Sequence, residues 1–198
     1  MTSYRCHSRL YKGKRCDVFF HKHPNRSLLI FIDLIIISPK NMSLLGKLEA
    51  DVEIKAPAGK FHDVFSCRPH HVNTMSPDKV HGVDIHEGDW GKEGTVITWN
   101  YTHDGVKKTT KEIVEAIDDK NNSTTFKVID GDLTKEYKDF RFIVKATPKP
   151  NGEGSVVHWT LAYEKRNAQI PDPATLLEFA VHCSKDIDAH LTQTHAQK

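Results

Sequence analysis

Two neighbouring segments decide the fold: Val156–Glu164 reads VVHWTLAYE, and Asp172–Leu191 reads DPATLLEFAVHCSKDIDAHL. In the first segment every second residue is apolar, which is typical of a strand with one apolar face. In the second, apolar residues recur every three or four positions, which predicts one long amphipathic helix. Asp172 is expected to cap this helix, with Pro173 at its first position. A half-apolar strand followed by a half-apolar helix indicates a sheet packed against that helix.

Six further runs upstream have the composition and spacing of strands, separated by turn signals such as Asp104-Gly105 and Asp130-Gly131-Asp132. Pro57 is expected to open a short helix after the first run, and a second short helix is expected near His70–Asn73. The pattern predicts an α+β fold, in which a seven-stranded antiparallel sheet curls around a long C-terminal helix, with two short helices after the first strand. The six runs are Leu44–Ile54, Val80–His86, Thr95–His103, Val106–Ile117, Thr124–Ile129 and Lys135–Thr147.

Alternation gives the predicted sheet one aromatic face and one polar face. The residues expected on the inner face are Ile97, Trp99, Tyr101, Phe140, Phe142, Val144, Val157, Trp159, Leu161 and Tyr163. The run Val106–Ile117 is ambiguous, because Ile113 and Ile117 compete with Val114 and Ala116 for that face. Glu112 could therefore point inward or outward.

The charge of the chain argues against a nucleic-acid partner. Residues 1–41 hold eight of the 28 Lys and Arg and two of the 26 Asp and Glu, which leaves 20 basic and 24 acidic side chains, a net charge of −4, in residues 42–198. Phosphate binding requires a basic face. The four cysteines have no metal-type spacing, and we expect a reduced protein in the cytoplasm.

The first 41 residues lack the periodic pattern of the rest. Their apolar run Leu28–Ile37 (LLIFIDLIII) would span about 15 Å as a helix, half of a bilayer core. No small-residue cleavage site follows it, and a zinc site is disfavoured because Cys6 and Cys16 lie too far apart. We expect residues 1–41 to be a disordered or non-functional extension without a membrane span, and residues 42–198 to form the domain.

Five stretches of the body carry a family resemblance: Leu45–Glu49 (LGKLE), His86–Gly94 (HEGDWGKEG), Val128–Asp132 (VIDGD), Lys145–Pro148 (KATP) and Trp159–Lys165 (WTLAYEK). In these, residues 42–198 resemble the major latex protein-like proteins of plants, a branch of the birch-pollen-allergen superfamily that includes the pathogenesis-related class ten proteins. The resemblance implies a helix-grip fold with a large apolar cavity between sheet and helix. It also implies binding of hydrophobic molecules such as sterols, fatty acids or flavonoid-like compounds, in plant defence or stress responses.

Enzymatic alternatives find little support in the residues. The glycine-rich loop Gly88–Gly94 lacks the Gly-Lys-Ser/Thr of a phosphate-binding loop and carries two carboxylates. Relatives have been proposed as ribonucleases, and the condensing enzymes of the superfamily depend on a Lys with acidic partners in the cavity. No His/His/Lys constellation is assignable here, and only Glu112 could supply an acid. The histidines, including His70-His71, have no metal-type spacing.

The sequence therefore favours a monomeric carrier of an apolar small molecule, with no catalytic residues, metal or cofactor and with a ligand that cannot be named. An apolar cavity with a few polar groups is sufficient for that function. The residues expected to contact the ligand are Phe65, Ile97, Trp99, Tyr101, Phe126, Val128, Phe140, Phe142, Val157, Trp159, Leu161, Tyr163, Phe179 and Cys183.

Overall fold

The computed structural model describes residues 43–150 and 152–193, which lie in the second of two compact units, residues 39–198. Residues 1–41, expected to be an extension, fall outside the described part of the chain. Two 3₁₀ turns, Pro69–His71 and Asp132–Lys135, accompany the regular elements. The elements are β1 (Leu45–Ile54), α1 (Ala58–Ser66), α2 (Val72–Met75), β2 (Val80–Glu87), β3 (Val96–His103), β4 (Val106–Asp118), β5 (Ser123–Gly131), β6 (Tyr137–Pro148), β7 (Ser155–Lys165) and α3 (Ala174–Gln193).

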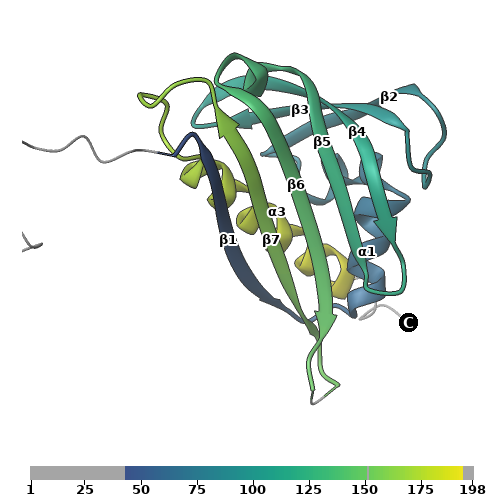
Figure 1. Ribbon diagram of the computed structural model, residues 1–198. Helices are drawn as coiled ribbons and strands as arrows, with labels where there is room; N and C mark the ends of the chain where they lie inside the picture. The colour runs from purple at the N-terminus through teal and green to yellow at the C-terminus, as the bar shows by residue number, and fades with distance from the viewer. Residues whose placement is uncertain (1–42, 151, 194–198) are drawn as a thin grey trace, which may run out of the picture. The chain divides into compact units, whose positions relative to one another are not determined.

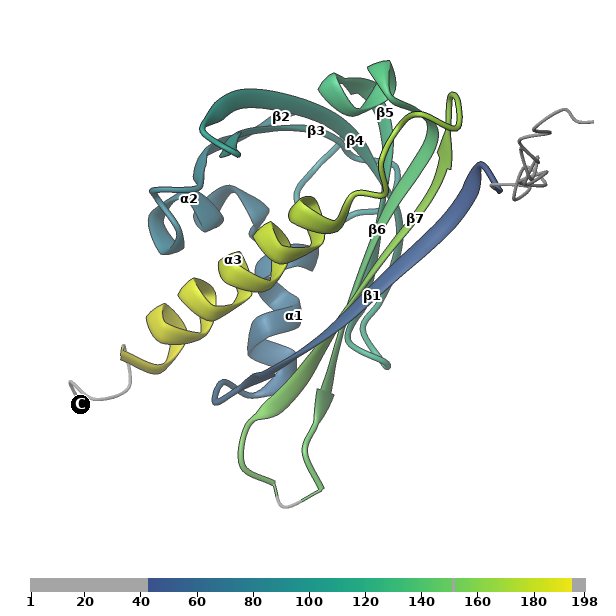
Figure 2. The same ribbon diagram turned by 90° about the vertical axis from the view of Figure 1, so that its left-hand side faces the viewer.

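The seven strands form one antiparallel sheet in the order β1-β7-β6-β5-β4-β3-β2. Strands β2 to β7 form a meander, and β7, the last strand, pairs with β1, the first. The sheet curves around α3, which crosses its concave side beside α1 (Figures 1 and 2). The predicted fold class, with its two short helices after the first strand, is confirmed.

The start of β1 requires a glycine because a side chain packs over it. Gly46 pairs with Tyr163 of β7, and a Cβ at Gly46 would overlap the Tyr163 ring. Tyr163 is buried, with its ring 5.5 Å from that of Tyr137. The glycine in the LGKLE stretch therefore lets an aromatic side chain lie against the edge strand.

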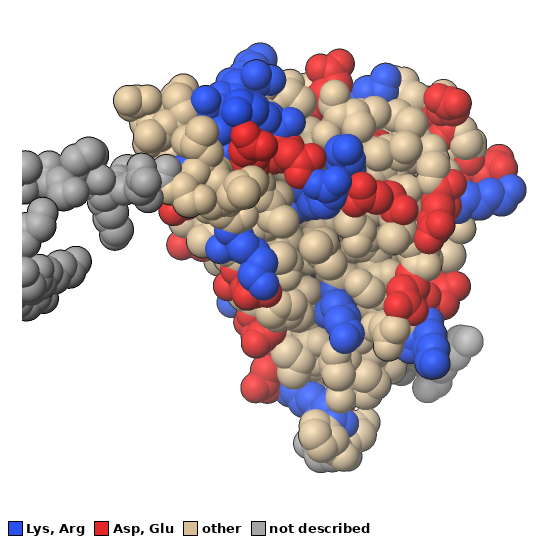
Figure 3. All heavy atoms as spheres, in the orientation of Figure 1, with Lys and Arg blue, Asp and Glu red and all other residues tan. Residues whose placement is uncertain are grey.

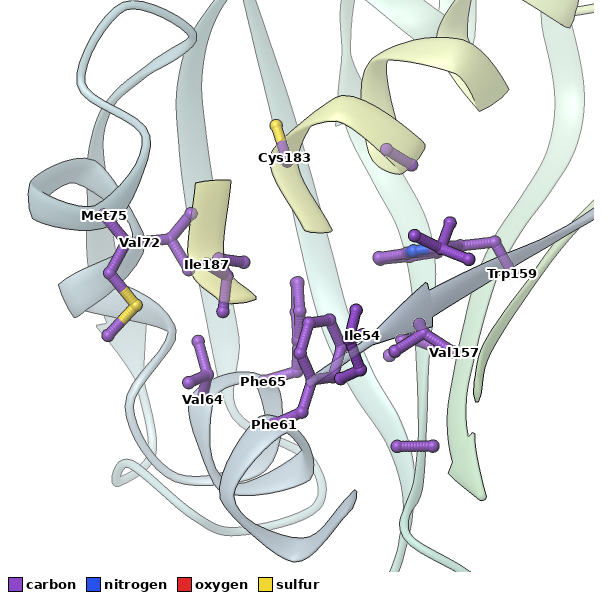
Figure 4. Close-up of a cluster of buried hydrophobic side chains, with 14 of the residues drawn as sticks. Ile54, Phe61, Val64, Phe65, Val72, Met75, Val157, Trp159, Cys183 and Ile187 are labelled. Atoms are coloured by element: carbon purple, nitrogen blue, oxygen red, sulfur yellow. The ribbon is translucent and has the colours of Figure 1, made fainter. Parts of the chain in front are cut away.

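The helix α3 presents one apolar face to the concave side of the sheet. Its buried residues are Leu176, Ala180, Cys183, Ser184 and Ile187. Figure 4 shows Phe61 and Phe65 of α1 between α3 and the sheet, with Val157 and Trp159 facing them from β7. The rings of Phe65 and Trp159 meet edge to face at 5.3 Å. Three elements that are distant in sequence thus share one core.

Both predicted helix starts are wrong by one residue. The carbonyl of Pro173 accepts the first helical hydrogen bond, from Leu177 N at 3.1 Å, so α3 begins at Ala174. Asp172 instead accepts a hydrogen bond from Lys165 Nζ at 3.0 Å, which ties the helix entry to the end of β7. Pro57 likewise precedes α1 with an extended backbone and occupies the cap position.

A β-bulge resolves the ambiguity in β4. Val114 pairs with Phe126 and Ala116 with Thr125, which leaves Glu115 as an extra residue on β4. A bulge reverses the inward and outward alternation beyond it. Val114 is therefore buried before the bulge, and Ile117 packs on the core after it. Glu112, on the same face as Val114, points inward and is 4% exposed.

The predicted strand Lys135–Thr147 starts too early. Asp132–Lys135 forms a 3₁₀ turn, and β6 begins at Tyr137. Leu133, 7% exposed, anchors the turn in the core, and Thr109 N donates to Asp132 Oδ2 at 2.8 Å.

The outer face of the sheet is a mixture of opposite charges. Figure 3 shows Lys and Arg side chains interspersed with Asp and Glu over the strands that face the viewer in Figure 1. Arg141 of β6 pairs with Glu115 of β4 at 2.8 Å, and Lys138 pairs with Glu164 at 2.8 Å. This face therefore lacks the basic patch that nucleic-acid binding needs. Within residues 43–150 and 152–193, no helix combines the length and apolarity needed to cross a bilayer.

Candidate functional site

An apolar cavity of about 80 Å³ lies between the concave face of the sheet and α3. Its wall comes from α1, α2, the six strands β2 to β7 and α3, so no single segment defines it. The residues that line it are Phe65, Val72, Val80, Trp99, Tyr101, Thr110, Glu112, Phe126, Phe142, Trp159, Leu176, Phe179, Ala180 and Cys183.

Eight of the fourteen predicted ligand-contacting residues lie at this cavity. They come from both sides of it: five from the sheet, one from α1 and two from α3. Their contact with a ligand stays a prediction. The eight are Phe65, Trp99, Tyr101, Phe126, Phe142, Trp159, Phe179 and Cys183.

The other six predicted residues are buried beside the cavity and do not line it. Ile97 and Val157 belong to the core cluster that contains Phe61 and Ile187. Val128, Phe140, Leu161 and Tyr163 belong to a second cluster with Tyr137 and Leu176. Alternation places five of the six, all but Val128, on the inner face correctly, but this face is longer than the cavity. The inner-face residues that do not reach the cavity therefore contribute core packing.

Six wall residues were missed by the sequence prediction: Val72, Val80, Thr110, Glu112, Leu176 and Ala180. Leu176 and Ala180 are four positions apart on the apolar face of α3, so the helical period could have identified them. Thr110 pairs with Trp99 across the β3–β4 ladder, a register that the sequence alone does not give.

Most polar groups of the wall are already hydrogen-bonded. Tyr101 Oη and Thr110 Oγ1 lie 2.9 Å apart, and Trp159 Nε1 donates to Ser184 Oγ at 2.8 Å. Burial raises the pKa of Tyr101 to about 12 and that of Cys183 to about 11. Both groups are therefore neutral at physiological pH.

Glu112 is the one carboxyl among the residues that line the cavity. Burial raises its pKa from 4.5 to about 8, and the interaction of the Trp99 indole N–H with the carboxyl opposes this rise only in part. The carboxyl is therefore mostly protonated at neutral pH. Trp99 Nε1 is buried and makes no hydrogen bond of normal geometry within the described residues.

The glycine-rich loop between β2 and β3 lies outside the cavity wall. Its own groups hold it in place: Thr95 Oγ1 donates to the Asp89 carbonyl at 2.6 Å, and Glu93 Oε1 accepts from Ile117 N at 2.8 Å. Trp90 stacks on His70 with ring centroids 4.5 Å apart. The loop is thus built as a turn that packs on the segment before α2. Across the described residues, no three His, Cys, Asp or Glu side chains gather as a metal site would require.

A curved antiparallel sheet that closes an apolar cavity against one long helix is the helix-grip architecture, a class of fold suited to holding hydrophobic small molecules. The comparisons with known proteins agree with this class. The chain belongs to the pathogenesis-related protein Bet v 1 family, whose family model matches residues 43–194. Members of this family generally bind hydrophobic ligands.

Within this family the chain is similar to the major latex proteins, so the resemblance in its sequence is confirmed. MLP-like protein 31 of Arabidopsis thaliana is 53% identical over 152 residues, which cover 77% of this chain and 89% of that protein. MLP-like protein 28 of Arabidopsis thaliana is 55% identical over 149 residues, 75% of this chain, but the match spans only 44% of its length. A crystal structure of major latex-like protein 151 from Panax ginseng superposes with a TM-score of 0.72 at 40% identity, covering 75% of this chain and 98% of that one.

Proposed function

We propose that this protein binds and carries a hydrophobic small molecule, a sterol, fatty acid or flavonoid-like compound, in the cavity between the sheet and α3. The observation that carries the proposal is the wall itself. Eight of its fourteen residues are aliphatic or phenylalanine, and in three more, Tyr101, Thr110 and Trp159, the polar group is already hydrogen-bonded within the protein. Such a surface gains free energy by burying apolar area.

The proposal assigns binding to residues 42–198 and none to residues 1–41. It places the protein in the cytoplasm as a monomer and gives it a role in plant defence or stress response. The likeness to major latex proteins supports this assignment, because it covers the domain that contains the cavity.

The size of the cavity implies that its wall moves when a ligand binds. Sites for drug-sized ligands measure about 300–1,000 Å³, whereas this one measures about 80 Å³. Large rings such as Phe142 and Phe179 are only partly buried at the wall and can change rotamer without opening the rest of the core. Binding would therefore exchange contacts among these rings for contacts with the ligand.

A condensing enzyme is the alternative favoured by one feature, the protonated carboxyl of Glu112. Acid catalysis would need a second titratable group at hydrogen-bond distance from the substrate. The described wall contains no Lys or His, and its other titratable side chains, Tyr101 and Cys183, are neutral. Under single-turnover conditions we expect RNA and condensation substrates to remain intact. Turnover that is abolished in Glu112→Gln would favour the enzyme.

The carrier function can be tested by native mass spectrometry after incubation with plant lipid extracts. Wild-type protein should appear with an added ligand mass. Ala180→Leu places a larger side chain in the wall and should lose the adduct, whereas Ala189→Leu, on the exposed side of the same helix, should keep it. An adduct retained equally by both variants would place the ligand outside the cavity and contradict the proposal.

A further inference from the structure

Some polar groups of the wall are hydrogen-bonded within the protein, and others are not. The hydroxyls of Tyr101 and Thr110 bond each other, and the indole N–H of Trp159 bonds Ser184. The thiol of Cys183 lies 3.9 Å from Ser76 Oγ, within reach of a weak hydrogen bond. These groups face partners that the fold itself supplies, so a ligand gains little from them.

Two groups are left, the indole N–H of Trp99 and the carboxyl of Glu112, which approach each other without a hydrogen bond of normal geometry. On the inner face of the β3–β4 ladder, Ile97 pairs with Glu112 and Trp99 pairs with Thr110, which makes Trp99 and Glu112 diagonal neighbours. Glu112 is 4% exposed, and Trp99 Nε1 is buried without a normal hydrogen bond in the described chain. A buried donor whose hydrogen bond is poorly formed costs free energy, and a well-placed ligand acceptor would recover it.

We propose that Trp99 and Glu112 form the polar subsite of the cavity and together donate hydrogen bonds to one carbonyl oxygen of an otherwise apolar ligand. This inference rests on the proposed carrier function and defines the chemistry of its ligand. The indole N–H can only donate, so it requires an acceptor. A protonated carboxyl also has an O–H to donate, and a carbonyl oxygen has two lone pairs that can accept from both.

The charge state of the wall favours a neutral ligand over a cationic one. An amine would have to remove the proton of Glu112 and bury an ion pair, whose desolvation offsets its attraction. A ketone satisfies both donors and requires no buried charge.

The titratable groups that face Glu112 across the cavity do not change charge in the range that tests this subsite. They are Tyr101 on β3 and Cys183 on α3, and burial holds their pKa values at about 12 and about 11. The residues that line the cavity from α1, α2, β2, β5, β6 and β7 are uncharged. A change in ligand affinity between pH 6.5 and 9 therefore reports on Glu112.

The test compares two probes of nearly equal shape, 2-acetylnaphthalene and 2-ethylnaphthalene, by isothermal titration calorimetry on the full chain. Glu112→Leu should weaken the ketone about tenfold and the hydrocarbon less than about twofold, since one hydrogen bond is lost only by the ketone. Trp99→Phe should weaken the ketone selectively by a similar factor. Glu112→Gln keeps an N–H donor and should stay within about threefold of wild type.

Dependence on pH separates donation from simple packing. In wild type the ratio of ketone to hydrocarbon affinity should fall about fivefold or more from pH 6.5 to 9, as the carboxyl loses its proton. In Glu112→Gln the ratio should be constant. Circular dichroism and thermal unfolding of each variant verify that it is folded.

Three outcomes would overturn the subsite. One is an unchanged ratio in both Glu112→Leu and Trp99→Phe. Another is a ratio in wild type that does not depend on pH. The third is tighter binding of 1-(2-naphthyl)ethylamine than of the ketone, with affinity that rises with pH, which would make Glu112 a partner for cations. Wild-type protein that binds neither naphthalene probe would instead contradict the carrier function itself.

Discussion

The indole N–H of Trp159 on β7 donates a hydrogen bond of 2.8 Å to the hydroxyl of Ser184 on α3. Ser184 in turn donates to the carbonyl of Ala180, one turn earlier, at 2.9 Å. Trp159 is 4% exposed and Ser184 is fully buried. The sheet and the helix that enclose the cavity are thus joined by a buried polar link directly at its wall.

Ser184→Ala should lower the free energy of unfolding by about 1–3 kcal/mol, because it leaves the Trp159 N–H buried without an acceptor. Thr192→Ala is the matched control, since the Thr192 hydroxyl also donates to a carbonyl four residues earlier, Asp188 O at 2.8 Å, and to Ala189 O at 3.2 Å, both on α3 itself. Its effect should stay within about 0.5 kcal/mol. Urea unfolding of both variants measures the difference. Equal losses would show that the link between sheet and helix contributes nothing.

The secondary structure could be predicted from the sequence because the segments with a regular apolar period are long and are separated by clear turn signals. Seven strand-like runs, two short helices and the long helix all appear in the structure. The errors occur where one residue changes the geometry. The bulge at Glu115 depends on pairing with β5, and the 3₁₀ turn Asp132–Lys135 depends on Leu133 reaching the core. Neither is encoded in a local period.

The stability of the protein should fall as pH rises through neutrality, because of Glu112. Its pKa is raised from 4.5 to about 8 in the folded state, so between these values the folded chain keeps a proton that the unfolded chain has lost. This contribution is fully present below pH 4.5 and is lost as pH rises to 8, with a slope of at most about 1.4 kcal/mol per pH unit.

Glu112→Gln should therefore flatten the dependence of the free energy of unfolding on pH between 5 and 8, as measured by urea titrations at each pH. Glu115→Gln is the control on the same strand. The ion pair with Arg141 lowers the pKa of Glu115, so its contribution is lost only at acid pH. A slope that survives in Glu112→Gln would mean that another group titrates.

The cavity wall was harder to predict than the fold, because it depends on which buried residues leave space between them. Alternation identifies both Leu161 of β7 and Phe142 of β6 as inner-face residues. In the structure the two are directly paired on adjacent strands. Only Phe142 reaches the cavity, whereas Leu161 is fully buried in the second cluster. The inward position of Glu112 likewise depended on the bulge three residues later.

A chain that starts at Met42 should melt within a few degrees of the full chain and bind the same ligands. The family match begins at residue 43, and the cavity wall runs from Phe65 to Cys183. Differential scanning calorimetry and ligand titration of both chains test this. A larger drop in melting temperature would show that residues 1–41 stabilise the domain, contrary to the proposed division of the chain.

Tryptophan fluorescence should locate the ligand, because the three tryptophans lie in different places. Trp99 and Trp159 line the cavity from β3 and β7, while Trp90 stacks on His70 outside its wall. A sterol or oleic acid, neither of which absorbs tryptophan emission, should change the fluorescence saturably at micromolar concentration, or about 8 kcal/mol of binding free energy. Trp90→Phe should keep this change.

Trp99→Phe and Trp159→Phe should each remove part of the fluorescence change, because one ligand in the cavity contacts both indoles. Leu161→Arg is a poor probe of the cavity, since Leu161 is fully buried away from its wall and an unpaired charge there would unfold the core. Ala180→Leu fills the cavity without a charge and should abolish the change while circular dichroism stays that of wild type. If Trp90 alone reports binding, the ligand sits near the glycine-rich loop, and the aromatic wall between β3, β7 and α3 is ordinary core.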